Sequence, residues 1–310
     1  MAARQTLISG VLTTAAAGTL VLQLLILPVW LLPADPRWGW LLVPVVLTTV
    51  PLWSLIHEGI HGTLLRDRRW NDRLARVLAT GYGAPFALLK AGHLLHHRYS
   101  RTRRERTEVY DPAVTTWLAA ARGYYPRLLG GLYLLEAASV VLAVVPAAGW
   151  RWLVRRTDSL DSVTGLLLDR VSRRDTLRRF RIEALAVVAT YAAAVAGYGR
   201  HAWMLAAAVG GRALLVSLAD NAYHYRTRLE RPLDAMNLRL PRPLELFVLA
   251  FNLHSVHHRH PGLHWFELRA AFHADADEWH LGWATAVARQ LRGPVPEPAL
   301  LGLEPLTPSR

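Results

Sequence analysis

The sequence contains no cysteine among its 310 residues. This absence excludes disulfides, thiolate zinc sites, iron–sulfur clusters and thiol catalysis, so a metal would have to be held by His, Asp, Glu or Asn. A glycine-rich nucleotide loop, an internal repeat and a low-complexity tract are also missing.

Lysine is almost absent as well. Lys90 is the single lysine, so arginine supplies nearly all of the net charge of +13. A strongly basic chain can indicate nucleic-acid binding, but these arginines gather beside long apolar runs, as positive cytoplasmic loops of membrane proteins do. The clearest sets are Arg66, Arg68 and Arg69, and Arg173, Arg174, Arg178 and Arg179. The distribution favours a membrane protein and argues against a nucleic-acid partner.

Hydrophobic residues make up 52% of the chain and are concentrated in runs long enough to cross a bilayer. Residues 7–32 and 38–56 predict two transmembrane helices. Residues 183–199 and 202–219 are separated by a short turn and predict a transmembrane hairpin. We therefore expect about four transmembrane helices.

Two other apolar runs are interrupted. Residues 74–92 contain Pro85 and several glycines, and residues 128–149 contain Glu136 and Pro146. We expect both to be re-entrant or interfacial, because a full crossing by 128–149 would separate the histidines that precede and follow it.

The predicted fold class is an all-α integral membrane protein with a cytoplasmic, histidine-rich cap over residues 254–283. Residues 1–283 are expected to form one membrane domain, and residues 284–310 a proline-containing tail.

Nine of the fourteen histidines lie in four groups, each at the end of an apolar run. On a helix, positions i, i+3 and i+4 share one face, so each group can direct its imidazoles to a common point. The spacing therefore predicts a metal site, whose expected ligands are His57 and His61 (HxxxH), His93, His96 and His97 (HxxHH), the single His224, and His254, His257 and His258 (HxxHH).

The number of histidines narrows the choice of metal. Imidazole binds iron, zinc, copper and nickel alike, but one zinc ion needs only three or four ligands. Nine histidines suffice for two metal ions and leave room for O2 or water. Because zinc has no redox chemistry, we expect two iron ions with O2 as co-substrate.

These boxes resemble those of the membrane fatty acid desaturase and hydroxylase superfamily, which includes acyl desaturases, carotenoid ketolases and alkane monooxygenases. The resemblance covers roughly residues 38–268, and the third box, from Asn252 to Pro261, is especially similar. It implies a further ligand at His224, with Asp220 as a possible metal ligand or Asn221 as a nearby support. Glu58 and Asn252 are also expected to support ligands from outside the metal's immediate shell.

The resemblance implies O2-dependent oxidation of an unactivated C–H bond in a lipid, with fatty acyl desaturation favoured. Carotenoid ketolation or hydroxylation and alkane or lipid hydroxylation are the alternatives. It also implies an external donor, either a ferredoxin, a rubredoxin or a cytochrome with its reductase. We expect a bacterial inner-membrane protein whose histidine boxes face the cytoplasm.

Three other interpretations are weaker. His57-Glu58-x-x-His61 alone matches the zinc protease motif, in which the glutamate is a general base, but two HxxHH boxes accompany it here. His260-Pro261-Gly262 resembles part of a cytochrome b5 haem loop, without the surrounding domain. A histidine-lined transporter would spread its ligands along a pore. The remaining histidines, His201, His260, His264, His273 and His280, lack the clustered spacing and are expected at the surface or interface.

Overall fold

The computed structural model describes residues 2–157 and 162–303. The chain begins with one long apolar rod formed by α1 (Ala2–Val21), the π-helical η1 (Leu22–Leu31) and α2 (Leu32–Ala34). Within it, Leu7–Ala34 is long and apolar enough to cross a membrane. Few of its side chains are buried by the rest of the protein, as expected of a helix that faces lipid.

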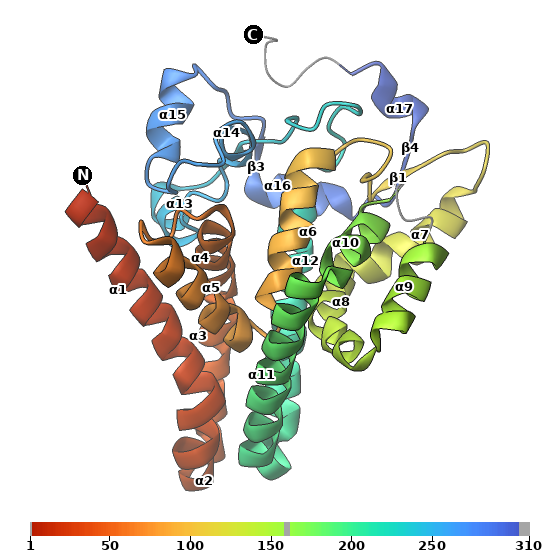
Figure 1. The fold of residues 1–310 in the computed structure, drawn as a ribbon. Coiled ribbons are helices and arrows are strands. Elements are labelled where there is room, and N and C mark those ends of the chain that lie inside the picture. The colour runs from red at the N-terminus through yellow and green to blue at the C-terminus, as the bar shows by residue number, and fades with distance from the viewer. Residues whose placement is uncertain (1, 158–161, 304–310) are drawn as a thin grey trace.

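A bent pair of helices returns toward the N-terminal end of the molecule (Figure 1). It comprises η2 (Pro36–Leu41) and α3 (Leu42–Leu47), followed after a 45° bend by α4 (Thr49–His61). Gly62 ends α4 in the left-handed conformation, with φ of 78°, which glycine adopts without steric cost. The pair counts as one further span if it crosses as a unit.

The run at 74–92 forms parts of two shorter helices, α5 (Arg68–Tyr82) and α6 (Phe86–Tyr99). Asp67 caps α5 by accepting from the amides of Arg69 and Trp70, and Gly83, with φ of 104°, ends it. Neither helix has the length of a candidate span. This agrees with a segment that does not cross the bilayer and returns the chain to the side it left.

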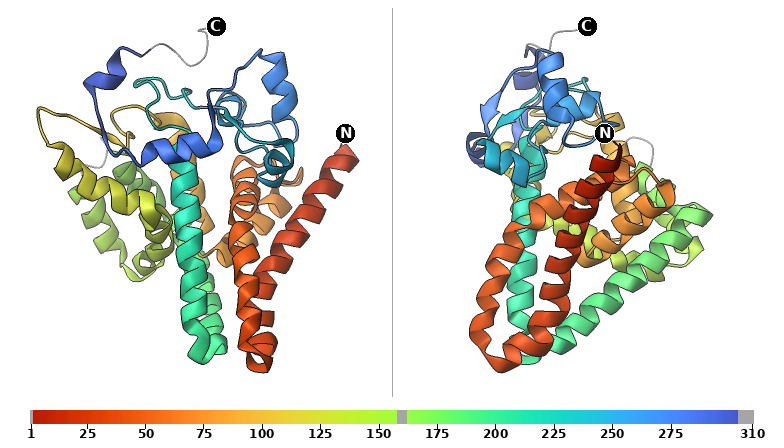
Figure 2. Two further views of the ribbon diagram at one scale, coloured as in Figure 1. Left: turned by 180° about the vertical axis from the view of Figure 1, so that it is seen from behind. Right: turned by 90° about the vertical axis from the view of Figure 1, so that its left-hand side faces the viewer.

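Residues 117–156 and 163–172 form a group of short, kinked helices. They are α7 (Trp117–Pro126), η3 (Arg127–Gly131), α8 (Leu132–Ala138), η4 (Ser139–Val144), α9 (Ala147–Arg156) and α10 (Val163–Ser172). Trp117–Val144 passes the length and hydropathy test for a span, but Leu129 and Gly130 interrupt it with non-helical backbone angles. The group does not reach the far end of the long helices, where α2 lies (Figures 1 and 2). The incomplete crossing expected of 128–149 stays a prediction, because this segment has the length and hydropathy of a span but a kinked backbone.

A helical hairpin supplies the remaining long elements: α11 (Arg174–Tyr198), the short η5 (Gly199–His201) and α12 (Ala202–Ala222). Together they form a 49-residue apolar stretch that the turn at η5 divides into two limbs (Figure 1). The Tyr198 hydroxyl donates to the Gln23 carbonyl at 2.8 Å and joins this hairpin to the first rod. The fold is thus the expected all-α membrane architecture.

A cap of short elements covers the end of the molecule where the N-terminus lies (Figures 1 and 2). Its helices are α13 (Arg242–Phe247), α14 (His254–Arg259), α15 (Leu268–Ala274), α16 (Trp283–Gln290) and α17 (Pro298–Leu301). Two parallel pairs of two-residue strands fasten it: β1 (Val109–Tyr110) with β4 (Val295–Pro296), and β2 (Leu238–Arg239) with β3 (Leu281–Gly282). Part of the expected tail is therefore folded against the cap, whereas residues 304–310 lie outside the described residues.

The C-terminal end of α5 is buried among the long helices. Arg212 of α12 donates to its last carbonyls, together with the hydroxyls of Tyr133 and Tyr191. The Arg212 guanidinium donates to the carbonyl of Tyr82 at 2.8 Å and to that of Gly81 at 3.3 Å. It also donates to the Tyr191 hydroxyl and to the Gln23 amide oxygen, both at 2.8 Å. A cation at the negative end of a helix dipole is stabilising, and buried carbonyls require donors.

We predict that Arg212→Leu lowers stability by about 1–3 kcal/mol, because it removes the donor of the Gln23 amide oxygen and one of the two donors of each of the Gly81 and Tyr82 carbonyls. Thermal unfolding of the purified protein in detergent would measure the loss, with exposed Arg174→Leu as the control. An Arg212→Leu protein that unfolds at the wild-type temperature or above would contradict this role.

Candidate metal centre

The structure brings all nine box histidines together in two groups. In each group every residue offers a ring nitrogen within 4.8 Å of the others. The first group is His57, His61, His93, His97 and His257, and the second is His96, His224, His254 and His258. The rings are buried or half-buried where α4, α6, α12 and the cap meet.

Helical geometry explains how one box serves both groups. Successive residues of an α-helix point about 100° apart, whereas residues i and i+4 point almost the same way. On α6, His93 and His97 therefore reach the first group, and His96 turns to the second. On α14, His254 and His258 reach the second group and His257 the first. Each HxxHH box thus bridges the two groups.

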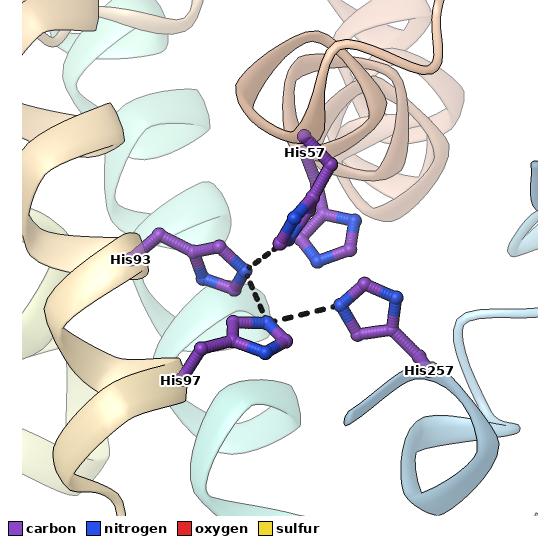
Figure 3. A group of neighbouring side chains, drawn as sticks. His57, His93, His97 and His257 are labelled. Atoms are coloured by element: carbon purple, nitrogen blue, oxygen red, sulfur yellow. Dashed lines mark hydrogen bonds between the residues drawn. The ribbon is translucent and has the colours of Figure 1, made fainter. Parts of the chain in front are cut away.

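The first group is drawn in Figure 3, where His57 comes from α4, His93 and His97 from α6 and His257 from α14. The Nε2 atom of His93 lies 3.0 Å from that of His61 and 3.0 Å from that of His97. The Nε2 atoms of His97 and His257 are also 3.0 Å apart. In the second group, the Nε2 atoms of His96 and His224 are separated by 3.1 Å, and those of His254 and His258 by 3.2 Å.

These spacings fit shared metal ions. Two nitrogens bonded at about 2.1 Å to one ion, with a right angle between the bonds, lie about 3.0 Å apart. The Nε2 atom of His57 is buried and has no hydrogen-bond partner among the described residues. A metal bond would satisfy this nitrogen. The donor set therefore fits two metal ions, one in each group.

The protonation state of the rings supports the same conclusion. Burial lowers the pKa of His254 and His257 well below the usual range, and the neighbouring imidazoles lower each further. These rings are neutral at physiological pH. Neutral imidazole is the form that binds metal.

Glu105 contacts the second group through His96, a partner that the sequence analysis missed. Its Oε1 atom lies 3.0 Å from the Nδ1 atom of His96. Burial lowers the pKa of His96, but the charge and hydrogen bond of Glu105 outweigh burial and raise it. Such a carboxylate fixes the imidazole so that Nε2 faces the metal, and makes it a stronger donor. Glu105 lies in an irregular loop, where no periodic spacing could reveal it.

Four residues were expected to bind the metal or to support its ligands. Two of them, Asp220 and Asn221, lie near the end of α12. Asp220 belongs to neither group; α12 ends at Ala222, so no continuous helix carries the one-turn spacing from Asp220 to His224. Asn221 donates to the side chain of Gln290 at 2.8 Å. A metal-bound Asp220 therefore stays a prediction that this arrangement does not support.

Glu58 and Asn252 hold backbone and hydroxyl groups near the boxes. The Glu58 carboxylate accepts from the Thr63 hydroxyl at 2.9 Å, just beyond the first box. The Asn252 amide donates to the Leu238 carbonyl at 2.9 Å, just before the third box. Neither interaction orients a box imidazole directly, so any support these residues give reaches the ligands through the backbone.

Two further buried interactions position the boxes. Asn237 accepts from the amides of Ser255 and Val256 at 3.1 and 3.3 Å and so caps the N-terminus of α14. Arg101 donates to Glu108 at 2.7 Å and to the Thr227 carbonyl at 2.7 Å. The Arg101 contacts tie the loop after the second box to the loop after His224.

The fold and the two histidine groups define a helical membrane protein with a centre that can hold metal. The model of the family described as fatty acid desaturase matches residues 37–287. The chain belongs to this family. No curated protein and no solved structure matches it.

We predict that His96→Ala and His257→Ala each remove about half of the iron bound by the wild type, because each truncates a different group. Iron per chain after anaerobic reconstitution would be measured by elemental analysis, with membrane insertion checked in parallel. His273→Ala, outside both groups, is the control. Undiminished iron in either variant would show that its ring is not a ligand.

We predict that Glu105→Gln weakens iron binding by about 10–100-fold, the usual effect of losing an outer partner of a ligand histidine. Competition with a graded chelator would measure the affinity, with exposed Glu230→Gln as the control. Equal affinities in the two variants would contradict the proposed support of His96.

Proposed function

We propose that this protein is a di-iron oxidoreductase that uses O2 to oxidise an unactivated C–H bond of a lipid, with fatty acyl desaturation as the favoured reaction. Membership of the desaturase family supports an enzyme of this superfamily. The observation that carries the proposal is the division of the nine histidines into two groups, bridged by both HxxHH boxes. A single zinc ion would bind to one of the two histidine groups and would leave the other group without a metal.

The residues that would hold the two ions are the nine histidines of these groups. When bound, a di-iron pair supplies the redox chemistry that activates O2 toward a C–H bond. The protein itself has to place one carbon beside the centre and exclude water. Desaturation removes two hydrogen atoms and releases two water molecules, whereas hydroxylation inserts one oxygen atom and releases one water molecule. Each reaction consumes one O2, two protons and two electrons from the donor, and takes two further electrons from the substrate. The position of the substrate carbon decides between them.

Buried aromatic side chains give the centre an apolar wall. The ring of Trp53 lies 6.4 Å from that of His93, and the ring of Phe251 lies 5.0 Å from that of His57. Tyr223 stacks on His254 at 4.5 Å. These side chains exclude water and suit the hydrocarbon part of a lipid.

The partners and location follow from the same features. The apolar helices support an integral membrane protein whose substrate enters from the lipid phase. We propose that the histidine groups face the cytoplasm of a bacterial inner membrane, where the arginine-rich loops would lie. A separate ferredoxin, rubredoxin or cytochrome with its reductase would supply the electrons, and an acidic donor would complement the basic loops.

Expression in a bacterial host, followed by mass spectrometry of the extracted lipids and elemental analysis of the purified protein, tests this function. We expect iron in both groups and a product that has lost two hydrogens relative to its precursor. The His257→Ala protein is the control and should give no product. A product with one added oxygen would instead identify a hydroxylase or ketolase, and one zinc per chain without iron would overturn the di-iron proposal.

A further inference from the structure

A pocket of about 210 Å³ opens between α5, α6, α10 and α11, outside the two histidine groups. Its wall contains four cations and two carboxylates, which leaves two positive charges in excess. The charged lining residues are Asp72, Arg76, Lys90, Arg170, Arg179 and Glu183.

The two carboxylates are already engaged by the inner cations. Lys90 lies 3.1 Å from Asp72, and Arg76 lies 2.9 Å from Glu183. Glu183 also accepts from the Ala87 amide at 2.6 Å. Their hydrogen-bonding capacity is largely used, so these acids hold Lys90 and Arg76 in place at the pocket.

The other two cations of the pocket are Arg170 and Arg179. Among the described residues, Arg170 and Arg179 form no ion pair or hydrogen bond, and both are exposed at the pocket. The excess positive charge therefore resides on two arginines whose donors are available. Guanidinium groups bind phosphate and carboxylate oxygens well because their paired N–H groups match the oxygen geometry.

The apolar lining of the pocket comes from α6. Phe86, Ala91 and Leu94 contribute to it, and the Nζ of Lys90 lies 5.5 Å from the centroid of the Phe86 ring. A lining that combines available cations with an apolar helix face suits an amphiphile with an anionic head. It suits a free inorganic anion less well, because such an ion gains nothing from the apolar face.

The pocket also adjoins the metal centre along the chain. Lys90 precedes His93 by three residues on α6, which corresponds to about 4.5 Å along a helix axis. Positions 90, 93 and 97 lie within about 60° of one another around that axis. A head group at Lys90 would thus sit beside the helix that presents two rings of the first histidine group.

We propose that this pocket binds the anionic head group, a phosphate or a carboxylate, of a lipid with an acyl chain. That the bound lipid is the substrate rests on the proposed function. The binding site itself does not, because binding can be measured without turnover. The acyl chain would extend along the apolar face that α6 contributes to the pocket.

The test measures binding of dodecyl phosphate and of dodecanol to the iron-loaded full chain in neutral detergent, by native mass spectrometry. Wild-type protein should bind dodecyl phosphate at least about tenfold more tightly than dodecanol. The double variant Arg170→Gln/Arg179→Gln should lose this preference. The matched control, Arg174→Gln/Arg178→Gln, removes the same charge from exposed positions that do not line the pocket and should keep it.

Two results would overturn the site: no preference for dodecyl phosphate in the wild type, or equal losses in the two double variants. Inorganic phosphate is the third probe. We expect it not to displace dodecyl phosphate at equal concentration, and displacement would reject the lipid assignment in favour of a free phosphate site. A wild-type protein that forms the product but shows no preference for dodecyl phosphate would refute this site alone, whereas a wild-type protein that shows the preference but forms no oxidation product would refute the proposed function alone.

Discussion

Nine imidazole rings packed together away from bulk water are the constraint on which this structure depends. Charging one ring would place a cation beside other rings in a poorly solvated site, which burial and mutual repulsion disfavour. Apart from His96, which Glu105 contacts, the rings therefore have to stay neutral, and their inward nitrogens need an electrophilic partner. Metal ions meet both requirements. The surrounding structure can be understood as the scaffold that keeps these rings at ligand spacing.

In that scaffold the boxes are held near helix ends by side-chain interactions of the neighbouring loops. The boxes lie at the end of α4, at the end of α6 and on the short α14, so no long helix passes through the centre. Short helices have little stability of their own. Asn237 compensates for this at α14 by capping its first amides, and the buried Arg101–Glu108 pair fixes the loop that follows α6. Breaking that pair would leave a buried charge without its partner, which is costly.

The features that depend on local periodicity could be predicted from the sequence. The one-turn spacing of the histidines was enough to predict that the boxes converge, and run lengths were enough to predict the long helices. Glu105 and Asn237 escaped prediction because each acts from an irregular segment whose path depends on distant contacts. The role of Arg212 could not be predicted for a related reason. In the sequence it is an isolated charge within the predicted span 202–219, and its partners at the end of α5 are distant along the chain.

The two histidine groups differ in polarity, and this difference organises the surroundings of the centre. The first group has five rings and faces Trp53, with no carboxylate in contact with its rings among the described residues. The second has four rings, a carboxylate at Glu105 and a small pocket nearby whose lining includes Asp220 and Arg127. Aromatic side chains therefore contact both groups, whereas among the described residues a carboxylate contacts the rings of the second group alone. The HxxHH boxes create this asymmetry, because a helix that turns the middle histidine of its box away from the other two gives each metal position a different set of neighbours.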